Sequence, residues 1–412
     1  MKILYILNRF PALSETFILN EIVALIQSGQ DVSILSLHRP QPGPVHDRVF
    51  RYDLLNKTGY LDLPVSGAPS GRFRAISNRV GMFLTDGRLT LAQKFRLMPL
   101  LFRKTQMLAI LDRVFLKTGT LPETMQWIRQ NRFDRIHCHF ASWNARIAYV
   151  FHKVLGVSYT LTTHAYDIFT DYEKDAKLLL EGAKRIIAIS EFNKNYMHNR
   201  FGIPRDKMDT VYYGIDFENM NPSPAYSVSP LRILSVSRLV PKKGLEYLIE
   251  ACKLLKSRGV PFTCEIWGEG AMRPVLEKHI REKGLEAHIK LGGVAANEKV
   301  LQLIRECSVF VLPCVKAANQ DMDGIPFVLM EAMALEIPVV STDITGIPEL
   351  IETGVDGVLV PQRDAFRLAE AMMKIAGDTE FAGRIRKAGR QKVAAKFESR
   401  KNAAKLIESF KK

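Results

Sequence analysis

The stretch Asp323-Gly-Ile-Pro-Phe-Val-Leu-Met-Glu331, which continues into Ala-Met-Ala-Leu-Glu-Ile-Pro-Val-Val, places two carboxylates eight residues apart. In one continuous helix they would lie about 12 Å apart along the axis, too far to hold one small group. Pro326 suits a first helical turn, so we expect Asp323 in a loop and a helix that begins near Pro326. The unpaired N–H groups of that turn would then form an anion site between the carboxylates.

An anion site with an acceptor on each side meets the needs of a nucleotide sugar. The helix N-terminus would hold the pyrophosphate, and the two carboxylates would accept hydrogen bonds from ribose and sugar hydroxyls. The same residues also allow a plainer interpretation, in which a buried helix follows a solvated aspartate.

The length of the chain and the spacing of its cysteines limit the classes of protein to which it can belong. The 412 residues suffice for two or more domains, and no apolar run approaches the roughly 20 residues of a membrane span. The five cysteines are odd in number and show no Cys-x-x-Cys spacing, which argues against a disulfide framework or zinc site. We therefore expect reduced thiols and a cytoplasmic protein.

The net charge of +15 is concentrated in residues 51–150, which hold 16 Lys and Arg against 6 Asp and Glu. Cations mixed with apolar residues favour an anionic membrane face or a lipid phosphate, and we expect peripheral binding at the inner membrane face. No helix-turn-helix, zinc or RNA-binding signature accompanies the charge, so we expect no nucleic-acid partner. A solvated basic helix face is the alternative. The densest cations are Arg72, Arg74, Arg79, Arg88, Lys94, Arg96, Arg103 and Lys104.

Apolar strand-like runs alternate with helical ones, which predicts an α/β protein with parallel sheets. The pattern restarts after a Pro/Ser-rich segment that ends at Pro230, so we expect two doubly wound domains with ligands at the strand C-termini in a cleft. The predicted bounds are 1–217, a linker 218–230, 231–395 and a C-terminal helix within 396–412. The predicted strands are Ile3–Leu7, Val32–Leu37, Arg135–His139, Tyr159–Thr163, Ile186–Ile189, Thr210–Tyr213, Ile233–Val236, Thr263–Trp267, Ile289–Leu291, Val309–Leu312, Val339–Ser341 and Val358–Val360.

Candidate residues of the first half follow its strands. The loop after the first strand carries Ser14, Glu15 and Thr16, and it lacks the Gly-x-Gly-x-x-Gly that a nicotinamide-binding domain would need. His164 and Asp167 follow Tyr159–Thr163 directly, a better place for chemistry than mid-strand. His137 and His139 would share one face of a strand, but without a third ligand nearby we expect no metal there.

Candidate residues of the second half also lie at strand ends. Arg238 and Lys243 occupy a short loop entering a helix, where they could bind a diphosphate. Gly268 and Gly270 end the next strand, where glycine lets backbone approach a ligand closely. Their order, followed by Asp323 and Glu331, is far more specific than any one motif.

These motifs resemble those of the retaining glycosyltransferases of family 4, which have the GT-B fold of two Rossmann-like domains facing a central cleft. The match covers nearly the whole chain and is most similar to the exopolysaccharide branch, including the colanic-acid glycosyltransferases. It rests on the residues above and on Thr163-His164-Ala-Tyr-Asp167, Ile189-Ser190-Glu191, Glu336-Ile-Pro-Val-Val and Gly346-Ile-Pro-Glu349. The chain departs from the family pattern at Asp323 (commonly Glu), Pro326 (commonly Gly) and Ser14-Glu15 (commonly Gly-Gly).

The resemblance implies transfer of a hexose from a nucleotide diphosphate sugar, a UDP-sugar first, to a glycan or a lipid-pyrophosphate-linked acceptor, without cofactor or metal. Arg238, Lys243 and the helix N-terminus near Phe327 would stabilise the leaving group, and Glu331 would bind ribose. Asp323 would hold the donor sugar, with Gly268 and Gly270 nearby. His164 would act near the reacting centre, and Ser14, Glu15, Thr16 and Asp167 would lie on the acceptor side. Asp321-Met-Asp323 mimics a metal motif but follows the wrong strand for one. A non-catalytic nucleotide-sugar or polyanion-binding protein, or an epimerase of this fold, remains an alternative.

Overall fold

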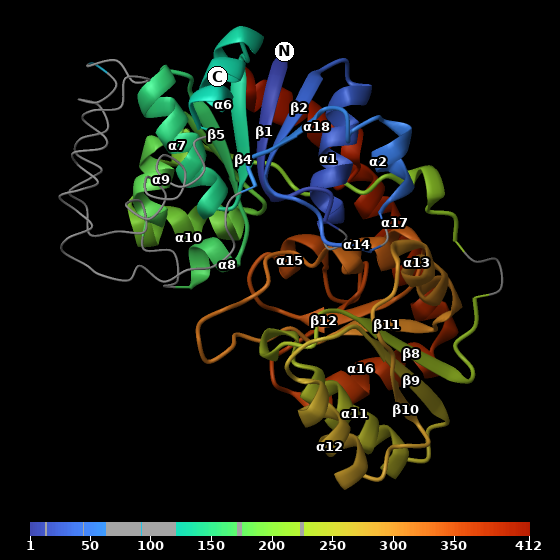
Figure 1. The fold of residues 1–412 in the computed structure, drawn as a ribbon. Helices are drawn as coiled ribbons and strands as arrows, with labels where there is room; N and C mark the ends of the chain where they lie inside the picture. The colour runs from blue at the N-terminus through green and yellow to red at the C-terminus, as the bar shows by residue number, and fades with distance from the viewer. Residues whose placement is uncertain (13–14, 44, 63–91, 93–120, 171–174, 223–225) are drawn as a thin grey trace. The chain divides into compact units, whose positions relative to one another are not determined.

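The computed structural model describes residues 1–12, 15–43, 45–62, 92, 121–170, 175–222 and 226–412. Contacts divide the chain into two compact units (Figure 1). Unit 1 comprises Met1–Ala188, Lys194–Thr210 and Ala404–Lys412, and unit 2 comprises Ile189–Asn193 and Val211–Ala403. The end of the chain thus groups with the first half. The domain bounds given by the sequence stay predictions.

The sheet of unit 1 has seven strands in the order β3-β2-β1-β4-β5-β6-β7, and all pairings among them are parallel. This order reverses between β1 and β4, as in a doubly wound Rossmann domain. The strands are β1 (Lys2–Arg9), β2 (Asp31–His38), β3 (Thr58–Tyr60), β4 (Arg135–His139), β5 (Tyr159–Thr163), β6 (Arg185–Ala188) and β7 (Met208–Thr210).

The helices of this half connect successive parallel strands, as crossover connections must. They are α1 (Thr16–Gln27), α2 (Asp47–Arg51), α6 (Leu121–Asn131), α7 (Trp143–Leu155), α8 (Tyr166–Phe169), α9 (Ala176–Gly182), α10 (Glu191–Phe201) and the short η2 (Arg205–Lys207). Helix α1 shows why such segments fold: its apolar residues Ile18, Ile22 and Leu25 recur at helical spacing and are all buried.

The sheet of unit 2 repeats the pattern with the parallel order β10-β9-β8-β11-β12-β13, which reverses between β8 and β11. Its strands are β8 (Leu231–Val236), β9 (Phe262–Trp267), β10 (Ile289–Leu291), β11 (Val309–Leu312), β12 (Val339–Thr342) and β13 (Val358–Val360). Its helices are α11 (Leu245–Ser257), α12 (Arg273–Glu282), α13 (Asn297–Glu306), α14 (Phe327–Ala334), α15 (Ile347–Leu350), α16 (Ala365–Gly377) and α17 (Thr379–Lys396), with the short helices η3 (Phe217–Asn219) and η4 (Pro241–Lys243). The last helix, α18 (Ser399–Lys411), begins in unit 2 and continues from Ala404 in unit 1.

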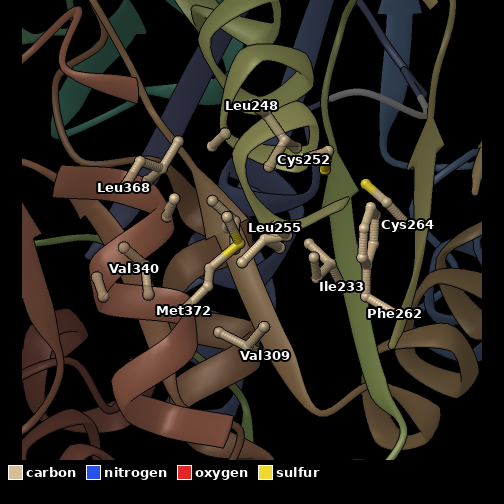
Figure 2. Packing of buried hydrophobic residues seen from close by; sticks show 14 of the residues in the cluster. Ile233, Leu248, Cys252, Leu255, Phe262, Cys264, Val309, Val340, Leu368 and Met372 are labelled. Carbon is tan, nitrogen blue, oxygen red and sulfur yellow. The ribbon is translucent and has the colours of Figure 1, made fainter. Parts of the chain in front are cut away.

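The second sheet packs against a separate apolar core on each face, and neighbouring residues of its strand β8 point into different cores. Ile233 joins the core formed with α11 and α16, whereas Leu234 joins the core formed with α13 and α14. Figure 2 shows side chains of α11 and α16 gathered against Ile233 and Val309 in the first of these cores. The two Rossmann-like domains expected from the sequence are therefore confirmed.

One strand prediction was wrong, and one strand was missed. The predicted strand Thr210–Tyr213 lies earlier in the chain, because Met208–Thr210 takes the register against Ile186 and Ala188 of β6. Strand β3 was missed, because Thr-Gly-Tyr offers no apolar run and all three residues are only half-buried. All five cysteines are buried and unpaired with one another in disulfides. Among the helices that the structure describes, none is long and apolar enough to cross a bilayer.

Candidate functional site

Two lysines and two aspartates form one ion-paired cluster in unit 2. Lys242 and Lys243 lie in η4, which follows β8, and Asp321 and Asp323 lie in the segment that leads from β11 to α14. Lys243 Nζ is 2.5 Å from Asp323 Oδ2. Lys242 Nζ is 3.0 Å from Asp321 Oδ1 and 3.2 Å from Asp323 Oδ1. The cluster therefore follows the two strands between which the strand order reverses, where open α/β sheets bind ligands.

The two lysines of the cluster are buried and the two aspartates are half-buried, and the ion pairs shift the pKa values of Asp323 and Lys242. Burial by itself would raise the pKa of Asp323, but the ammonium groups of Lys243 and Lys242 outweigh it and hold that pKa below its usual value. Burial likewise lowers the pKa of Lys242, but Asp323 and Asp321 outweigh it and raise that pKa overall. The ion pairs therefore favour the charged forms of Asp323 and Lys242. Sequence reasoning missed Lys242, although its place directly before Lys243 was a signal.

Gly244 allows the chain after η4 to lie close to the chain after β11, and this contact brings the lysines and aspartates of the cluster together. It has a φ of 61°, and a Cβ there would lie 2.1 Å from the carbonyl oxygen of Pro313. Only glycine fits such a position, and it allows η4 to lie directly against the chain that leaves β11. The Val315 N–H donates to the carbonyl of Lys242 at 2.9 Å and fixes the same contact.

Gly268 and Gly270 are in contact with backbone rather than with open space. A Cβ on Gly268 would lie 1.8 Å from the Ser237 oxygen, and one on Gly270 would lie 2.4 Å from the Leu239 oxygen. Packing of the β9 end against the β8 loop thus explains both glycines without a ligand. Arg238, between these loop residues, is exposed. The donor-binding role of the two glycines stays a prediction.

Helix α14 begins at Phe327 with Pro326 in the cap position, which confirms the predicted helix start and places Asp323 in the preceding loop. Glu331 lies in the second turn of the helix and is only 5% exposed. Its Oε1 accepts a hydrogen bond from Asn297 Nδ2 at 3.1 Å. Burial raises the pKa of Glu331 to about 7, and the Asn297 hydrogen bond only partly opposes this. Asn297, the first residue of α13, was missed because nothing in its local sequence marks it.

In unit 1, Asp167 holds the two turns that surround His164. One of its carboxylate oxygens accepts from the His164 N–H at 3.0 Å, and the other accepts from the Ala141 N–H at 2.8 Å. Asp167 therefore ties the turn after β5 to the turn after β4. The acceptor-side role expected of Asp167 stays a prediction.

The His164 ring itself is buried among aromatic rings. Its centroid lies 4.0 Å from that of Phe140 in a stacked arrangement and 5.2 Å from that of Phe17. Its Nε2 is 3.0 Å from His139 Nδ1, and His139 Nε2 is 3.0 Å from Glu21 Oε1. Sequence reasoning missed this link to Glu21, because Glu21 lies on α1, more than a hundred residues from either histidine.

Glu21 also bears on the expectation of no metal in this half. The ligand atoms of Glu21, His137 and His139 lie within 4.8 Å of one another, so the third ligand that the sequence did not reveal is present. Glu21 Oε1, however, already accepts from the Tyr5 hydroxyl at 2.6 Å as well as from His139.

Of the acceptor-side candidates, Glu15 and Thr16 are half-buried at the start of α1, and Ser14 lies outside the described residues.

Family models match both halves of the chain. Residues 216–392 match "Glycosyl transferases group 1", and residues 89–219 match "Glycosyltransferase Family 4". The putative colanic acid biosynthesis glycosyltransferase WcaL of Escherichia coli K12 is 31% identical over 409 residues, which cover 96% of each chain. The amylovoran biosynthesis glycosyltransferase AmsK of Erwinia amylovora is 31% identical over 418 residues, with the same coverage.

A solved structure supports the fold. The crystal structure of Anabaena Alr3699/HepE in complex with UDP and glucose superposes with a TM-score of 0.72 at 17% identity, over 100% of this chain and 99% of that one. Structure neighbours of this kind are GT-B glycosyltransferases, so the predicted fold class is confirmed. The resemblance seen in the motifs is confirmed as well. This chain belongs to the group 1 glycosyltransferases of glycosyltransferase family 4.

Proposed function

We propose that this glycosyltransferase moves a hexose from a UDP-sugar, with retention at the anomeric carbon, to a glycan or lipid-pyrophosphate-linked acceptor of exopolysaccharide synthesis. The observation that carries the proposal is the ion-paired cluster of Lys242, Lys243, Asp321 and Asp323, which leads into the N-terminus of α14. Cations and helix N–H groups in one place suit a diphosphate, and a carboxylate beside them suits a sugar hydroxyl.

The chemistry follows from where charge develops. As the bond from the anomeric carbon to the β-phosphate oxygen breaks, the electron pair leaves with the nucleoside diphosphate. Arg238, Lys243 and the first turn of α14 would stabilise that charge by fixed dipoles and cations. The salt bridge to Asp323 uses one of the three N–H donors of Lys243, so the other two can meet phosphate oxygens. The acceptor hydroxyl enters on the same face and gives its proton to the departing phosphate.

The donor and acceptor are proposed from similar proteins. The Anabaena structure contains UDP and glucose, and the two curated relatives are named for colanic acid and amylovoran synthesis. The eight cations of the basic segment, from Arg72 to Lys104, lie outside the described residues. Its charge nevertheless supports peripheral association with an anionic cytoplasmic membrane face, where a lipid-linked acceptor would reside.

Donor hydrolysis and transfer assays test this proposal directly. We expect UDP release from UDP-glucose or UDP-galactose, faster than nucleotide release from GDP-mannose or ADP-glucose. Activity should survive excess EDTA, because both carboxylates of Asp321-Met-Asp323 are paired with lysines. Proton NMR should show the α-anomer of the released sugar before mutarotation.

Each outcome excludes a specific alternative. Release of the β-anomer would contradict retention, and loss of activity to EDTA with recovery in Mn²⁺ would contradict metal independence. Preference for GDP-mannose would contradict a UDP-sugar donor. Conversion of one UDP-sugar into another without UDP release would identify an epimerase, and binding without any turnover would identify a binding protein.

Donor affinity should depend on pH through Glu331. A ribose hydroxyl donates best to a carboxylate, and the Glu331 carboxyl is protonated below its pKa of about 7. The dissociation constant for UDP-glucose should therefore fall as pH rises through 7, by about tenfold per unit below that point. Isothermal calorimetry between pH 5.5 and 8.5 would measure it. UDP-glucose is the suitable ligand, because its diester phosphates do not titrate in this range.

The Glu331→Gln variant is the matched control for this pH dependence. It keeps the shape and the acceptor oxygen but has no proton to lose, so its affinity should be weaker and flat with pH. Folding stability changes in the opposite sense, because a folded-state pKa above the ordinary carboxyl value favours the protonated native protein. Glu331 therefore contributes stability that is fully present below the ordinary carboxyl pKa of 4.5 and is lost as pH rises from there to about 7, and the variant should not show that loss. A wild-type affinity that is flat with pH would contradict the role of Glu331.

A further inference from the structure

Lys242 and Lys243 are consecutive, yet their ammonium groups have different surroundings. Within the described parts of the chain, Lys243 Nζ pairs with one oxygen, Asp323 Oδ2 at 2.5 Å. Lys242 Nζ lies near three oxygens, which are Asp321 Oδ1 at 3.0 Å, Asp323 Oδ1 at 3.2 Å and the Met322 carbonyl at 3.4 Å. An ammonium group has three N–H donors. The oxygens around Lys242 thus equal its donors in number, whereas Lys243 keeps donors for a ligand.

The three oxygens around Lys242 belong to one acidic tripeptide, Asp321-Met322-Asp323, near the end of the connection from β11 to α14. This connection, residues 313–326, contains no helix or strand. The backbone of Lys242 also holds the beginning of the connection, because the Lys242 carbonyl accepts from the Val315 N–H at 2.9 Å. Lys242 is therefore in contact with both ends of a connection that has no regular structure of its own to fix it.

Lys242 can fix the acidic tripeptide because it is both buried and charged. Only 4% of the residue is exposed. Burial alone would lower its pKa, but the carboxylates of Asp323 and Asp321 outweigh burial and raise that pKa. Its ammonium group lies between the two carboxylates that a metal would bring together in an Asp-x-Asp motif. Moving the tripeptide away would leave a buried cation without partners, which is costly.

Asp323 needs such a fixed partner when the donor is bound. Its Oδ1 lies beside Lys242, whereas its Oδ2 receives Lys243 and also the Cys314 thiol, at 3.3 Å. If Lys243 binds the diphosphate, its pull on Asp323 weakens. Lys242 then remains beside the carboxylate, keeps it in place for a sugar hydroxyl and offsets its charge next to an anionic ligand.

We propose that Lys242 is a positioning residue for glycosyl transfer, which holds the acidic tripeptide so that the Asp323 carboxylate meets a hydroxyl of the donor sugar. Lys243 is left to the diphosphate. The two consecutive lysines thereby serve the two halves of the donor, one through Asp323 and the other directly. This inference rests on the proposed function, because it requires that a nucleotide sugar binds beside the cluster.

The double variant Lys242→Met/Asp321→Asn tests the positioning role, because it removes the hold on the tripeptide without changing the net charge of the cluster. Its kcat with UDP-glucose should fall about 10–100-fold, since a misplacement of about 1 Å away from the reacting atoms can cost a factor of roughly 10². The dissociation constant for UDP, which lacks the sugar, should stay within about threefold of the wild type in isothermal calorimetry. Lys243→Met, the same substitution at the neighbouring lysine, should weaken UDP binding as well as slow turnover.

The ion pair of Lys392 and Asp356 provides the matched control in the same unit. Lys392 Nζ is 2.8 Å from Asp356 Oδ2, and the Asp356 side chain is only 3% exposed. Asp356 precedes β13, so this pair lies near the edge of the parallel sheet where strands begin, whereas the cluster follows strands that have ended. Lys392→Met/Asp356→Asn should lower the melting temperature but keep kcat within about twofold of the wild type.

Hydrogen exchange followed by mass spectrometry reads the hold on the tripeptide without any assay of activity. The Ala317 N–H donates to the Asp321 carbonyl at 3.0 Å, so its protection depends on the tripeptide staying in place. Peptides that cover residues 315–323 should exchange faster in Lys242→Met/Asp321→Asn than in the wild type. Their exchange should be unchanged in the Lys392→Met/Asp356→Asn control.

Two results would overturn the positioning role of Lys242. Unchanged kcat in a folded Lys242→Met/Asp321→Asn variant would show that the ion pair only supports the fold. A loss of UDP affinity as large as that of Lys243→Met would make Lys242 a ligand of the diphosphate instead. If circular dichroism shows that the double variant is unfolded, the milder Asp321→Ala decides, because it leaves Lys242 paired with Asp323. Its kcat should fall and its UDP affinity should not, and an unchanged kcat would again contradict the proposal.

The exchange measurement separates this inference from the proposed function. If the wild type releases no UDP from any nucleotide sugar while residues 315–323 exchange faster in the double variant, the proposed function fails and the hold of Lys242 on the tripeptide stands. If the wild type transfers sugar but the double variant keeps both its kcat and its exchange rates, only the positioning role fails.

Discussion

Arg238→Ala is expected to lower turnover on the order of 10²-fold, with little change in melting temperature. The guanidinium is exposed in the loop after β8, so truncation leaves no buried group without a partner. Its proposed partner is the diphosphate, on which charge grows as the glycosidic bond breaks, and a fixed donor at such a place supplies roughly this factor. Exposed substitutions usually change stability by less than about 0.5 kcal/mol. Steady-state kinetics with UDP-glucose and differential scanning fluorimetry would measure both effects.

Two further variants make this result specific. Arg367→Ala removes another exposed guanidinium of unit 2, which pairs along its own helix with Glu370, and should leave turnover unchanged. Arg238→Lys keeps the charge but loses the planar fork and should recover only part of the activity. Near-normal turnover of Arg238→Ala would contradict the assignment of Arg238 to the leaving group.

Lys243→Met should damage both turnover and stability. Turnover should fall on the order of 10²-fold for the reason given for Arg238. In addition, Asp323 would lose the nearer of its two cations in a site where its side chain is only 13% exposed. Removing one partner of a buried ion pair usually lowers the free energy of unfolding by about 3–5 kcal/mol. We expect a loss of about 3 kcal/mol here, because Asp323 would still have Lys242 at 3.2 Å. The melting temperature should therefore drop by roughly 6–12 °C.

The double variant Lys243→Met/Asp323→Leu separates stability from chemistry. Replacing both partners of a buried pair by apolar groups is often neutral or stabilising, so the melting temperature should recover most of its loss. Turnover should not recover, because the cation and the sugar-binding carboxylate are both absent. Recovery of turnover together with stability would show that the pair only supports the fold.

The fold was predictable because the buried strands of a parallel sheet have sequences that are short apolar runs. The run Val309–Leu312 matches β11 to the residue, since all four of its side chains are buried. The run Ile289–Leu291 also matches β10 to the residue, although Lys290 in it is exposed. Strand β3 escaped because Thr58, Gly59 and Tyr60 are half-buried and hold their place through pairing with β2. Such an edge strand has no local pattern to detect.

The candidate site was predictable only as far as it is local. The start of α14 follows from Pro326, and the placement of Lys243 after β8 follows from the strand pattern. What the sequence could not show is which charges meet. The pairing of Lys243 with Asp323 joins positions 80 residues apart, and Glu21 meets His139 across 118. Long-range partners of this kind are set by the tertiary fold, not by spacing.

The balanced charges of the cluster have a consequence for how the enzyme encounters its donor. Lys242, Lys243, Asp321 and Asp323 sum to zero, so beyond a Debye length of about 10 Å in 0.1 M salt they exert almost no pull on an approaching anion. Long-range attraction of the donor then comes from exposed cations such as Arg238. This attraction raises the rate of association, and it weakens as the ionic strength rises. The buried lysines can attract the diphosphate of the donor only once it is in contact with them. The cluster by itself therefore adds nothing to the long-range attraction of polyanions, which is left to the basic charge of the rest of the protein.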